Sequence, residues 1–524
     1  MAVNVVLYGP PAAGKTSVGR ALSRRLGREF VDVDELVSLR AGRSIQAIFD
    51  RDGEDAFRRL ERDACAELAS GGARVIALGA GALIDASSRT CLERSGPVVC
   101  LRAAPADLSA RIGPGTGRPL VSGADPGGRL AHLLEARRAH YDSFPEHVGT
   151  SGRTVEAVTD DVAGLLAPHH LAVRAPGLSH GVLVGYGVLD DLTALLASEG
   201  LTGPFALVTD ENVNRCLAGR LPDDAPRVVL PPGETQKTPA VSAGLCERFA
   251  GFGLDRHSIV IAIGGGVTGD LAGFAAATFM RGIRWVNVPT TLLAMVDASV
   301  GGKTGVNLRA GKNLVGAFHP PALVVADPLA LATLPTAERR SGMAEVVKHA
   351  VIGGPALFEA LERAPAFGCV RQLADAIGVK IRVVQDDPFE RGERATLNLG
   401  HTVGHAVETV SGYALRHGEA VAIGLAAEAQ LAVRMGLTTR DVVARIGAVL
   451  DGLGLPTTYR GATAPGLRAA MASDKKKVGA TLKFALPVGI GDVRHGIEVD
   501  EALLMEVLDG VVSVGTSAPG LGFR

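Results

Sequence analysis

The chain has few aromatic residues and no excess of either charge, and both shortages restrict what it can be. Only 4% of its 524 residues are aromatic, while 67 are glycine. This composition is typical of α/β folds with many glycine turns. Lysines and arginines number 54, against 55 aspartates and glutamates. Because nucleic acids and anionic membranes attract basic surfaces, this balance argues against either as the main partner.

Paired cysteines and long apolar runs are also missing. The six cysteines are scattered without a CxxC pair, which argues against a disulfide framework and predicts reduced thiols. The opening residues MAVNVVLYGP lack the basic region and cleavage site of a signal peptide. The most apolar stretch, Ile259 to Met280, contains Asp270 and several glycines, so a buried strand and helix explain it better than a membrane span. We therefore expect a cytoplasmic protein.

Apolar strands alternate with helical segments in two blocks. The first block has predicted strands at 3–8, 30–33, 75–78 and 98–101, and the second at 205–209, 228–230, 259–263, 285–288 and 323–326. This alternation predicts parallel sheets covered by helices on both faces. Pro168 and Pro176 mark the junction between the blocks, and after Pro328 the pattern becomes mainly helical.

A phosphate-binding motif opens the first block. Residues Gly9 to Thr16 read GPPAAGKT, which matches GxxxxGK[ST] between a strand and a helix. In this motif backbone amides surround the phosphates, Lys15 reaches the β- and γ-phosphates, and the Thr16 hydroxyl binds Mg²⁺. Asp32 and Asp34 follow the second strand. One could hold the Mg²⁺ shell and the other could bind or deprotonate a substrate hydroxyl, although a helix cap explains such a pair equally well.

The second block carries a glycine turn, glycine-flanked lysines and paired histidines. The sequence IVIAIGGGVTGD at 259–270 is a strand, turn and helix whose amides could meet a pyrophosphate, although packing alone explains it as well. Lys303 and Lys312 lie among glycines and apolar residues, which suggests an anion-binding floor. His401 and His405 are four residues apart on one helix face. From this spacing alone they are either two ligands of one metal ion or histidines that lie in the core or in solvent.

Residues 1–165 resemble shikimate kinase. The resemblance rests on the phosphate loop, the two aspartates, FRRLE at 57–61, GAG at 79–81, GRPL at 117–120 and Arg137 ahead of Tyr141. It implies that ATP and Mg²⁺ are bound by Gly9, Gly14, Lys15, Thr16, Asp32 and a lid residue, Arg118. It also implies that shikimate is held by Asp34, Arg58, Gly79, Ala80, Gly81 and Arg137, with Lys15, Asp34 and Arg118 as catalytic residues.

Two positions depart from the pattern of that family. Its phosphate loop usually has another glycine where this chain has Ala12 and Ala13, and its glycine turn usually has a third glycine where this chain has Ala80. Both substitutions are small, and we expect them to affect turnover more than the identity of the ligand.

Residues from about 172 to 520 resemble 3-dehydroquinate synthase. The shared motifs are PGETQKT at 232–238, GGGVTGD at 264–270, FMRG at 279–282, PTTLL at 289–293, MAEVVK at 343–348, NLGHTVGHAVE at 398–408, HGE at 417–419 and DKK at 474–476. The resemblance implies that zinc, or cobalt, binds Glu345, His401 and His417. His405 then becomes a proton-transfer or phosphate-contacting residue. Such a ligand set leaves an open position for substrate hydroxyls.

The same resemblance assigns the cofactor and substrate contacts. It implies NAD contacts with Asp210, Asn212, Glu234, Lys237, Gly264, Gly265, Gly266, Asp270, Thr290 and Thr291. It implies substrate contacts with Asp297, Lys303, Lys312, Asn313, Lys348, Lys380, Arg394, Asn398, His405 and either Lys475 or Lys476, among which Lys303, Lys348 and His405 are catalytic. Arg281 would complete the site of a neighbouring subunit, which implies a homodimer through this half.

These patterns predict a bifunctional shikimate-pathway enzyme that acts on small molecules. The expected order is an α/β P-loop kinase domain at 1–165 and a linker at 166–178. A Rossmann-like NAD-binding α/β domain at 179–330 and a helical zinc- and substrate-binding domain at 331–524 follow.

Other functions are compatible with parts of these patterns. The second block could be a polyol dehydrogenase, but its basic residues suit an acidic substrate. It could also be another sugar-phosphate cyclase, against which Lys380 and Arg394 argue because they suit a carboxylate. The first block could be another small-metabolite kinase or a non-catalytic nucleotide-binding module. Arg58 and Arg137 around Asp34 favour shikimate.

Overall fold

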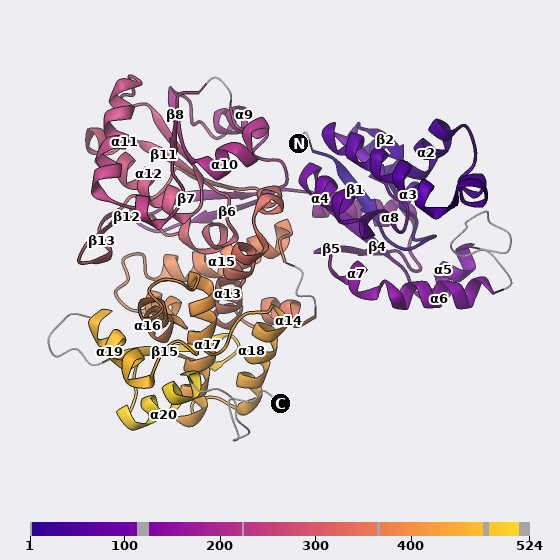
Figure 1. Cartoon of the computed structure of the whole chain (residues 1–524). Helices are drawn as coiled ribbons and strands as arrows, with labels where there is room; N and C mark the ends of the chain where they lie inside the picture. The colour runs from indigo at the N-terminus through magenta and orange to yellow at the C-terminus, as the bar shows by residue number, and fades with distance from the viewer. Residues whose placement is uncertain (1–2, 113–124, 223–224, 364–366, 475–481, 513–524) are drawn as a thin grey trace.

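The computed structural model describes residues 3–112, 125–222, 225–363, 367–474 and 482–512, which form two units side by side (Figure 1). The first unit is built on a five-stranded parallel sheet in the order β2-β3-β1-β4-β5. Its strands are β1 (Val5–Tyr8), β2 (Glu29–Asp32), β3 (Arg74–Ala77), β4 (Val98–Arg102) and β5 (Glu146–Gly149). The central strand β1 is completely buried, as its run of apolar residues predicts.

Helices cover this sheet and start at its carboxyl edge. The first helix begins directly after Gly14, which has a left-handed backbone (φ 97°), and it ends at Gly27, which is also left-handed. The helices are α1 (Lys15–Leu26), α2 (Val33–Ala41), α3 (Ile45–Ser70), the short η1 (Ala82–Ile84), α4 (Ala86–Ser95), α5 (Pro105–Ile112), α6 (Pro126–Ala136), α7 (Arg138–Asp142) and α8 (Val155–Leu165).

The second unit begins with a seven-stranded sheet in the order β6-β7-β14-β11-β10-β8-β9. All neighbours are parallel except β6 and β7. The strands are β6 (His169–Val173), β7 (His180–Val184), β8 (Phe205–Asp210), β9 (Arg227–Leu230), β10 (Ile259–Gly264), β11 (Arg284–Pro289) and β14 (Leu323–Ala326). Strand β6 lies inside the predicted linker 166–178, so residues 169–173 of that segment belong to the second unit's sheet.

Short helices and one hairpin complete this half of the second unit. The hairpin β12 (Lys303–Leu308) and β13 (Gly311–Phe318) packs against the helix that follows the glycine turn. The helices are α9 (Leu192–Ser198), α10 (Glu211–Cys216), η3 (Ala218–Arg220), η4 (Glu234–Gln236), α11 (Pro239–Gly251), α12 (Gly266–Thr278), η5 (Phe279–Arg281), the π-helix η6 (Ala294–Ala298) and η7 (Pro328–Thr333).

The rest of the chain is mainly helical, as predicted. Helices α13 and α17 are buried along most of their lengths and form its core. The elements are α13 (Thr336–Gly353), α14 (Pro355–Arg363), α15 (Val370–Asp386), η8 (Glu393–Asn398), α16 (His401–Val410), α17 (His417–Arg434), α18 (Arg440–Gly452), α19 (Ala464–Asp474), β15 (Lys483–Gly489), β16 (Asp492–Glu498) and α20 (Glu501–Val512). Within the described residues, no helix combines the length and apolarity needed to cross a membrane.

The two units share a packed interface. One apolar cluster runs from the first unit through Val3 and Leu166 into Leu178 and the second unit's sheet. The Tyr186 hydroxyl of the second unit donates a hydrogen bond of 3.0 Å to the buried Glu146 of the first. Such continuous burial fixes the units relative to each other.

Candidate active sites

The first site is a cavity of about 510 Å³ at the carboxyl edge of the first sheet. Parallel sheets with crossover helices bind ligands at this edge. The cavity brings together most of the residues predicted for ATP and shikimate, which are Gly14, Lys15, Thr16, Asp32, Asp34, Arg58, Gly79, Ala80 and Gly81. The predicted lid residue Arg118 lies outside the described residues.

The phosphate loop already has its polar groups arranged. The Lys15 ammonium donates to the carbonyls of Gly9 (2.9 Å) and Pro10 (2.8 Å), and the Thr16 hydroxyl donates to Asp32 (2.7 Å). Asp32 also accepts from the backbone N–H of Asp34 and so caps α2. Asp32 can therefore cap α2 and also belong to the Mg²⁺ shell, because a different oxygen of its carboxylate is available for each role.

Ala12 adopts the backbone that a glycine would favour. Its φ is +62°, a left-handed value that costs an L-residue about 1–2 kcal/mol. Ala13 is not among the residues that have a positive φ. The glycine usual in the related family thus corresponds physically to position 12.

The glycine turn at 79–81 is in close contact with two carboxylate side chains. A Cβ at Gly79 would lie 2.7 Å from the Glu61 carboxylate and 3.0 Å from that of Asp34. Between the two glycines, the carbonyl of Ala80 accepts hydrogen bonds from the side chains of Tyr8 (3.0 Å), Arg137 (3.0 Å) and Tyr141 (3.1 Å). Arg137 therefore braces the turn rather than lining the cavity.

Glu61 and Arg111 also line this cavity, and sequence reasoning did not single them out as site residues. Glu61 is buried and accepts from Arg58 (2.6 Å). Burial raises the pKa of Glu61 despite that arginine. Arg111 donates to Thr150 and, at 3.4 Å, to the carbonyl of Ala12. Only the motif FRRLE gave a signal for Glu61, and nothing in the local sequence marks Arg111.

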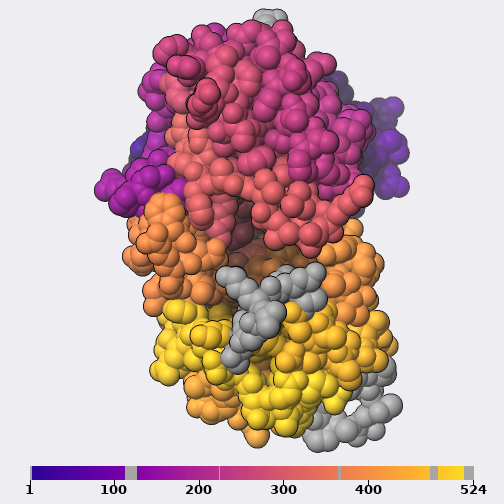
Figure 2. Space-filling model, turned by 90° about the vertical axis from the view of Figure 1, so that its left-hand side faces the viewer, coloured from indigo at the N-terminus to yellow at the C-terminus, as the bar shows by residue number. Residues whose placement is uncertain are grey.

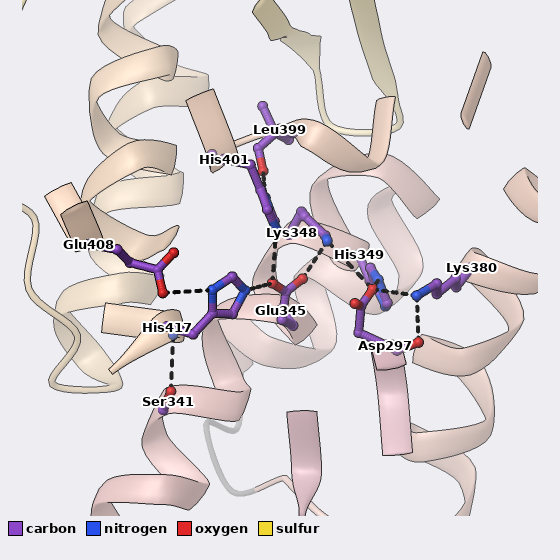
Figure 3. Close-up of polar contacts among 12 residues, drawn as sticks. Asp297, Ser341, Glu345, Lys348, His349, Lys380, Leu399, His401, Glu408 and His417 are labelled. Carbon is purple, nitrogen blue, oxygen red and sulfur yellow. Dashed lines mark hydrogen bonds and ion pairs between the residues drawn. The ribbon is translucent and has the colours of Figure 1, made fainter. Parts of the chain in front are cut away.

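The second site is centred on three metal-ligating side chains. Donor atoms of Glu345, His401 and His417 lie within 4.8 Å of one another, close enough for one ion. Glu345 Oε1 is 3.5 Å from His401 Nε2 and 3.2 Å from His417 Nε2, and Figure 3 shows both rings directed at this carboxylate. His405 belongs to a second group with Glu408 and His417.

Hydrogen bonds set both imidazoles in an orientation that suits a metal. His401 Nδ1 faces the carbonyl of Leu399 at 3.1 Å, so Nδ1 carries the proton and Nε2 offers its lone pair. His417 Nδ1 faces Glu408 at 3.4 Å, a carboxylate–histidine pair that directs its Nε2 toward Glu345. The donor set therefore fits a catalytic zinc or cobalt site.

Burial and neighbouring charges set the ionisation of the three ligand residues. Burial lowers the pKa of His401 to about 3 and keeps the ring neutral. For His417 burial acts in the same direction, but the hydrogen bonds to Glu345 and Glu408 outweigh it and raise the pKa to about 10. Although Glu345 is fully buried, the adjacent Lys348 ammonium keeps its pKa well below the usual range. Glu345 therefore stays ionised and can supply an anionic ligand to a metal ion.

Asp297 connects this centre to a group of buried cations (Figure 3). Its Oδ1 lies 2.9 Å from Lys380, 3.7 Å from Lys348 and 3.5 Å from His349. The two lysines hold the pKa of Asp297 well below its ordinary value against the effect of burial. Asp297 lies on the π-helix η6, a rare element that is frequent at functional sites. His349 was not predicted from the sequence.

A cavity of about 580 Å³ opens beside these residues, in the hollow that Figure 2 shows between the two halves of the second unit. It is lined by many of the predicted cofactor and substrate residues, which are Asp270, Asp297, Lys303, Asn313, Lys348, Lys380, Arg394, Asn398 and His401. Lysine and arginine predominate over acids in this list, so the cavity suits an anion.

The predicted NAD residues lie around the glycine turn and the hairpin. The buried Lys237 pairs with Asp270 (2.5 Å) and donates to Asn313 (2.6 Å), and Glu234 accepts from Asn307 (2.7 Å). The Thr290 amide donates to Gly264 (2.9 Å), and a Cβ at Gly265 would meet the Thr291 methyl at 3.2 Å. Gly266 begins α12, while Asp210 caps α10 and accepts from the Asn212 amide.

Three of the predicted substrate residues that the structure describes do not line this cavity. Lys312 lies over the Tyr413 ring at 4.0 Å and 3.9 Å from Glu408. The His405 ring packs 5.3 Å from that of His401. Arg281 is exposed and left-handed (φ 68°), away from the cavity of its own chain. Lys475 and Lys476 lie outside the described residues.

Known protein families match both units. Family models match residues 11–166 (shikimate kinase), 227–341 (3-dehydroquinate synthase N-terminal) and 342–477 (3-dehydroquinate synthase C-terminal). A 3-dehydroquinate synthase from Synechococcus sp. (strain CC9605) is 41% identical over 360 residues, which cover 65% of this chain and 97% of that protein.

Two solved structures resemble the second unit. A 2-deoxy-scyllo-inosose synthase complexed with carbaglucose-6-phosphate, NAD⁺ and Co²⁺ is 27% identical with a TM-score of 0.60, covering 66% of this chain and 100% of that one. A 2-epi-5-epi-valiolone synthase from Streptomyces hygroscopicus subsp. jinggangensis 5008, with NAD⁺ and Zn²⁺ bound, is 31% identical with a TM-score of 0.58, covering 63% and 96%.

Proposed function

The chain belongs to the 3-dehydroquinate synthase family and carries a shikimate kinase domain at its N-terminal end, and from this premise we propose two reactions at two separate sites. It is a bifunctional enzyme of the shikimate pathway with a kinase half and a lyase half. The two cavities share no lining residue, and the two reactions therefore run independently.

In the first half, the reaction is transfer of the γ-phosphoryl group of ATP, with Mg²⁺, to the 3-hydroxyl of shikimate. Lys15 and the amides of the phosphate loop hold the phosphates, and Thr16 with Asp32 orients the metal. Asp34 binds the attacking hydroxyl and accepts its proton. Arg58 lines the cavity and holds the carboxylate, and Arg137 supports the 79–81 turn beside it through the Ala80 carbonyl.

The observation that supports this proposal is the common cavity of the phosphate loop, Asp34 and Arg58. The test compares ADP formation with shikimate and with its methyl ester, which keeps the hydroxyls and removes the charge. Shikimate should be phosphorylated, and the ester should lose most of kcat/KM. Equal rates with both compounds would contradict a site built around a carboxylate.

In the second half, the reaction converts 3-deoxy-arabino-heptulosonate 7-phosphate to 3-dehydroquinate with release of phosphate. When bound, NAD⁺ would supply transient oxidation and return of hydride, and a zinc or cobalt ion held by Glu345, His401 and His417 would supply polarisation of substrate hydroxyls. Lys380 and Arg394 bind the carboxylate. Lys303, Asn313, Lys348 and Asn398 contact the rest of the substrate, and His405 and Lys312 meet the phosphate end.

The observation that supports this substrate is the buried lysine and arginine pair of the cavity. Lys380 and Arg394 are 7% and 3% exposed and lie where a carboxylate would neutralise them. Asp297 already pairs with Lys380, but no carboxylate of the described residues forms an ion pair with Arg394. A cyclase that takes an uncharged sugar end would leave that buried cation without a partner, at a cost. Phosphate release should therefore require the heptulosonate, and should be lost with a seven-carbon sugar phosphate that lacks the carboxylate. The reverse preference would assign the site to another cyclase.

The second half acts as a homodimer in which Arg281 reaches the neighbouring subunit's cavity. Its exposed position, away from the cavity of its own chain, supports this assignment. Mixing inactive Arg281→Ala and Lys348→Ala chains should restore phosphate release in hybrid dimers. Hybrids that remain inactive would contradict it.

A further inference from the structure

A third cavity lies between the two units and is assigned to neither reaction. Its volume is about 390 Å³, which falls in the usual range of small-molecule sites. The first unit contributes α4 and the residues that lead into β5, and the second contributes η7, the start of α13 and Phe367. None of its lining residues lines either active cavity.

Three arginines line this cavity, and one of them is already neutralised. Arg89 pairs with Glu93 at 2.8 Å, donates to Ser143 and stacks over the Phe144 ring at 4.4 Å. It forms a fixed part of the wall. The remaining acid that lines the cavity, Glu146, accepts from Tyr186 at 3.0 Å.

Arg339 and Arg340 are less well compensated. Arg339 donates to the carbonyl of Leu331 at 2.7 Å, and no carboxylate within the described residues lies within ion-pair distance of it. Burial and the like charge of Arg89 lower its pKa against the pull of Glu93. Arg340 reaches Glu419 only at 3.4 Å, and its buried Nε has no hydrogen-bond partner in the described part of the chain.

Much of the remaining wall of this cavity is apolar. Leu329, Leu331, Met343, Phe367 and Leu453 line it together with the ring of Tyr186. Two guanidinium groups that line one cavity and have unused donors suit a carboxylate, which accepts such donors in pairs. The apolar wall suits a hydrocarbon ring or chain of a few carbons.

We propose that this cavity binds a small organic acid with a ring-sized apolar body, its carboxylate on Arg339 and Arg340 and its ring against Leu329, Leu331 and Met343. The ligand touches both units at once. It also replaces Glu419 as the partner of Arg340. The next residue, Ser341, accepts the amide of Gly418 at 3.0 Å, so binding takes place beside the start of α17, where His417 lies.

The test uses benzoate as the probe and benzamide as its uncharged isostere, with the full chain and saturating shikimate to fill the kinase acid site. Binding is followed by saturation-transfer NMR. Benzoate should bind saturably and benzamide should not. Arg339→Gln should weaken benzoate binding about tenfold, as the loss of one charge-assisted pair predicts.

Arg94→Gln is the matched control, because Arg94 is an exposed arginine of α4 outside the cavity and should leave benzoate binding unchanged. Arg340→Gln provides a second variant on the cavity, and both activities of Arg339→Gln report that the chain is folded. Undetectable benzoate binding to the unaltered chain would overturn the proposal. So would equal binding of benzamide, or benzoate binding that neither Arg339→Gln nor Arg340→Gln weakens.

Discussion

Neighbouring positions of the turn at 79–81 accept a methyl group very differently. A Cβ at Gly81 would lie 2.8 Å and 2.9 Å from the two terminal nitrogens of Arg58. Ala80 already carries a methyl group, and the turn uses its carbonyl oxygen, on which three side chains converge. Position 81 is therefore constrained by Arg58, which we assign to the shikimate carboxylate. Position 80 is not constrained in this way.

We expect Gly81→Ala to displace the Arg58 guanidinium and to raise the KM for shikimate about tenfold to a hundredfold, the value of one charge-assisted hydrogen bond. The KM for ATP should stay unchanged, because the phosphate loop lies on the other side of the cavity. Ala80→Gly is the matched control and should alter neither constant. Steady-state kinetics measure both. An unchanged KM for shikimate in Gly81→Ala would remove Arg58 from the proposed contacts.

Individual site residues could be predicted where a contiguous motif carries them. Lys15 and Thr16 belong to a motif whose context is local, so the sequence places them correctly in one cavity. His349 and Arg111 escaped because their partners are distant in sequence: His349 meets Asp297, and Arg111 meets Thr150 and Ala12. Such contacts depend on packing between elements, which no spacing rule contains.

The metal ligands also come from different helices, and sequence spacing within one helix cannot bring them together. His401 and His417 are the first residues of α16 and α17, and Glu345 lies on α13. Spacing within one helix pairs His401 with His405. The structure instead brings His401 to Glu345 and His417, which come from two other helices. Family resemblance, rather than helix periodicity, suggested this set.

This arrangement predicts separate effects for the three histidines. His401→Gln and His417→Gln should lose the bound metal, because each removes one of three ligands. His405→Gln should retain one ion per chain and lose phosphate release instead. Glu408→Gln should weaken metal affinity about 10–100-fold through the orientation of His417. Metal content after dialysis, measured by mass spectrometry, checks all four variants. A metal-free His405→Gln chain would contradict the assignment of the ligands.

The apolar run of β10 was predicted closely, whereas the strands of the two hairpins were missed. Strand β10 is buried at every position, and its predicted range differs by one residue. The hairpin strands β13 and β16 alternate partly exposed and exposed residues, so they lack that signal. Strand β6 was placed in a linker because prolines flank it. The π-helix that carries Asp297 has no sequence signature.

How the two units pack against each other could not be predicted from the sequence at all. The prediction treated 166–178 as a connection and gave no contact between the halves. The structure has a buried interface in which Tyr186 donates to Glu146. Its residues come from elements that are each complete within their own unit, so nothing in either local pattern indicates the other.

This interface predicts a pH dependence of stability. Burial raises the pKa of Glu146 to about 7, well above that of an exposed glutamate. The native state binds this proton more tightly than the unfolded state does. The resulting stabilisation of the fold is fully present below about pH 4.5, the pKa of an exposed glutamate. That contribution disappears as the pH rises through 7. It amounts to about 3 kcal/mol, given 1.36 kcal/mol for each pKa unit.

The free energy of unfolding of the unaltered chain should therefore fall from pH 5 to pH 8 relative to that of Glu146→Gln, which cannot titrate. Urea unfolding at each pH measures the difference. Parallel stability curves for the two chains would show that Glu146 is not buried against Tyr186 in solution.

The central claim is that one chain carries two independent active sites, and the most direct measurement is of both reactions in three chains. The first reaction is shikimate-dependent ADP formation, and the second is phosphate release from the heptulosonate with NAD⁺ and zinc. We predict that the unaltered chain performs both, that Lys15→Ala loses only the first, and that Lys348→Ala loses only the second. An unaltered chain without shikimate-dependent ADP formation, or a Lys15→Ala chain that retains it, would contradict this account.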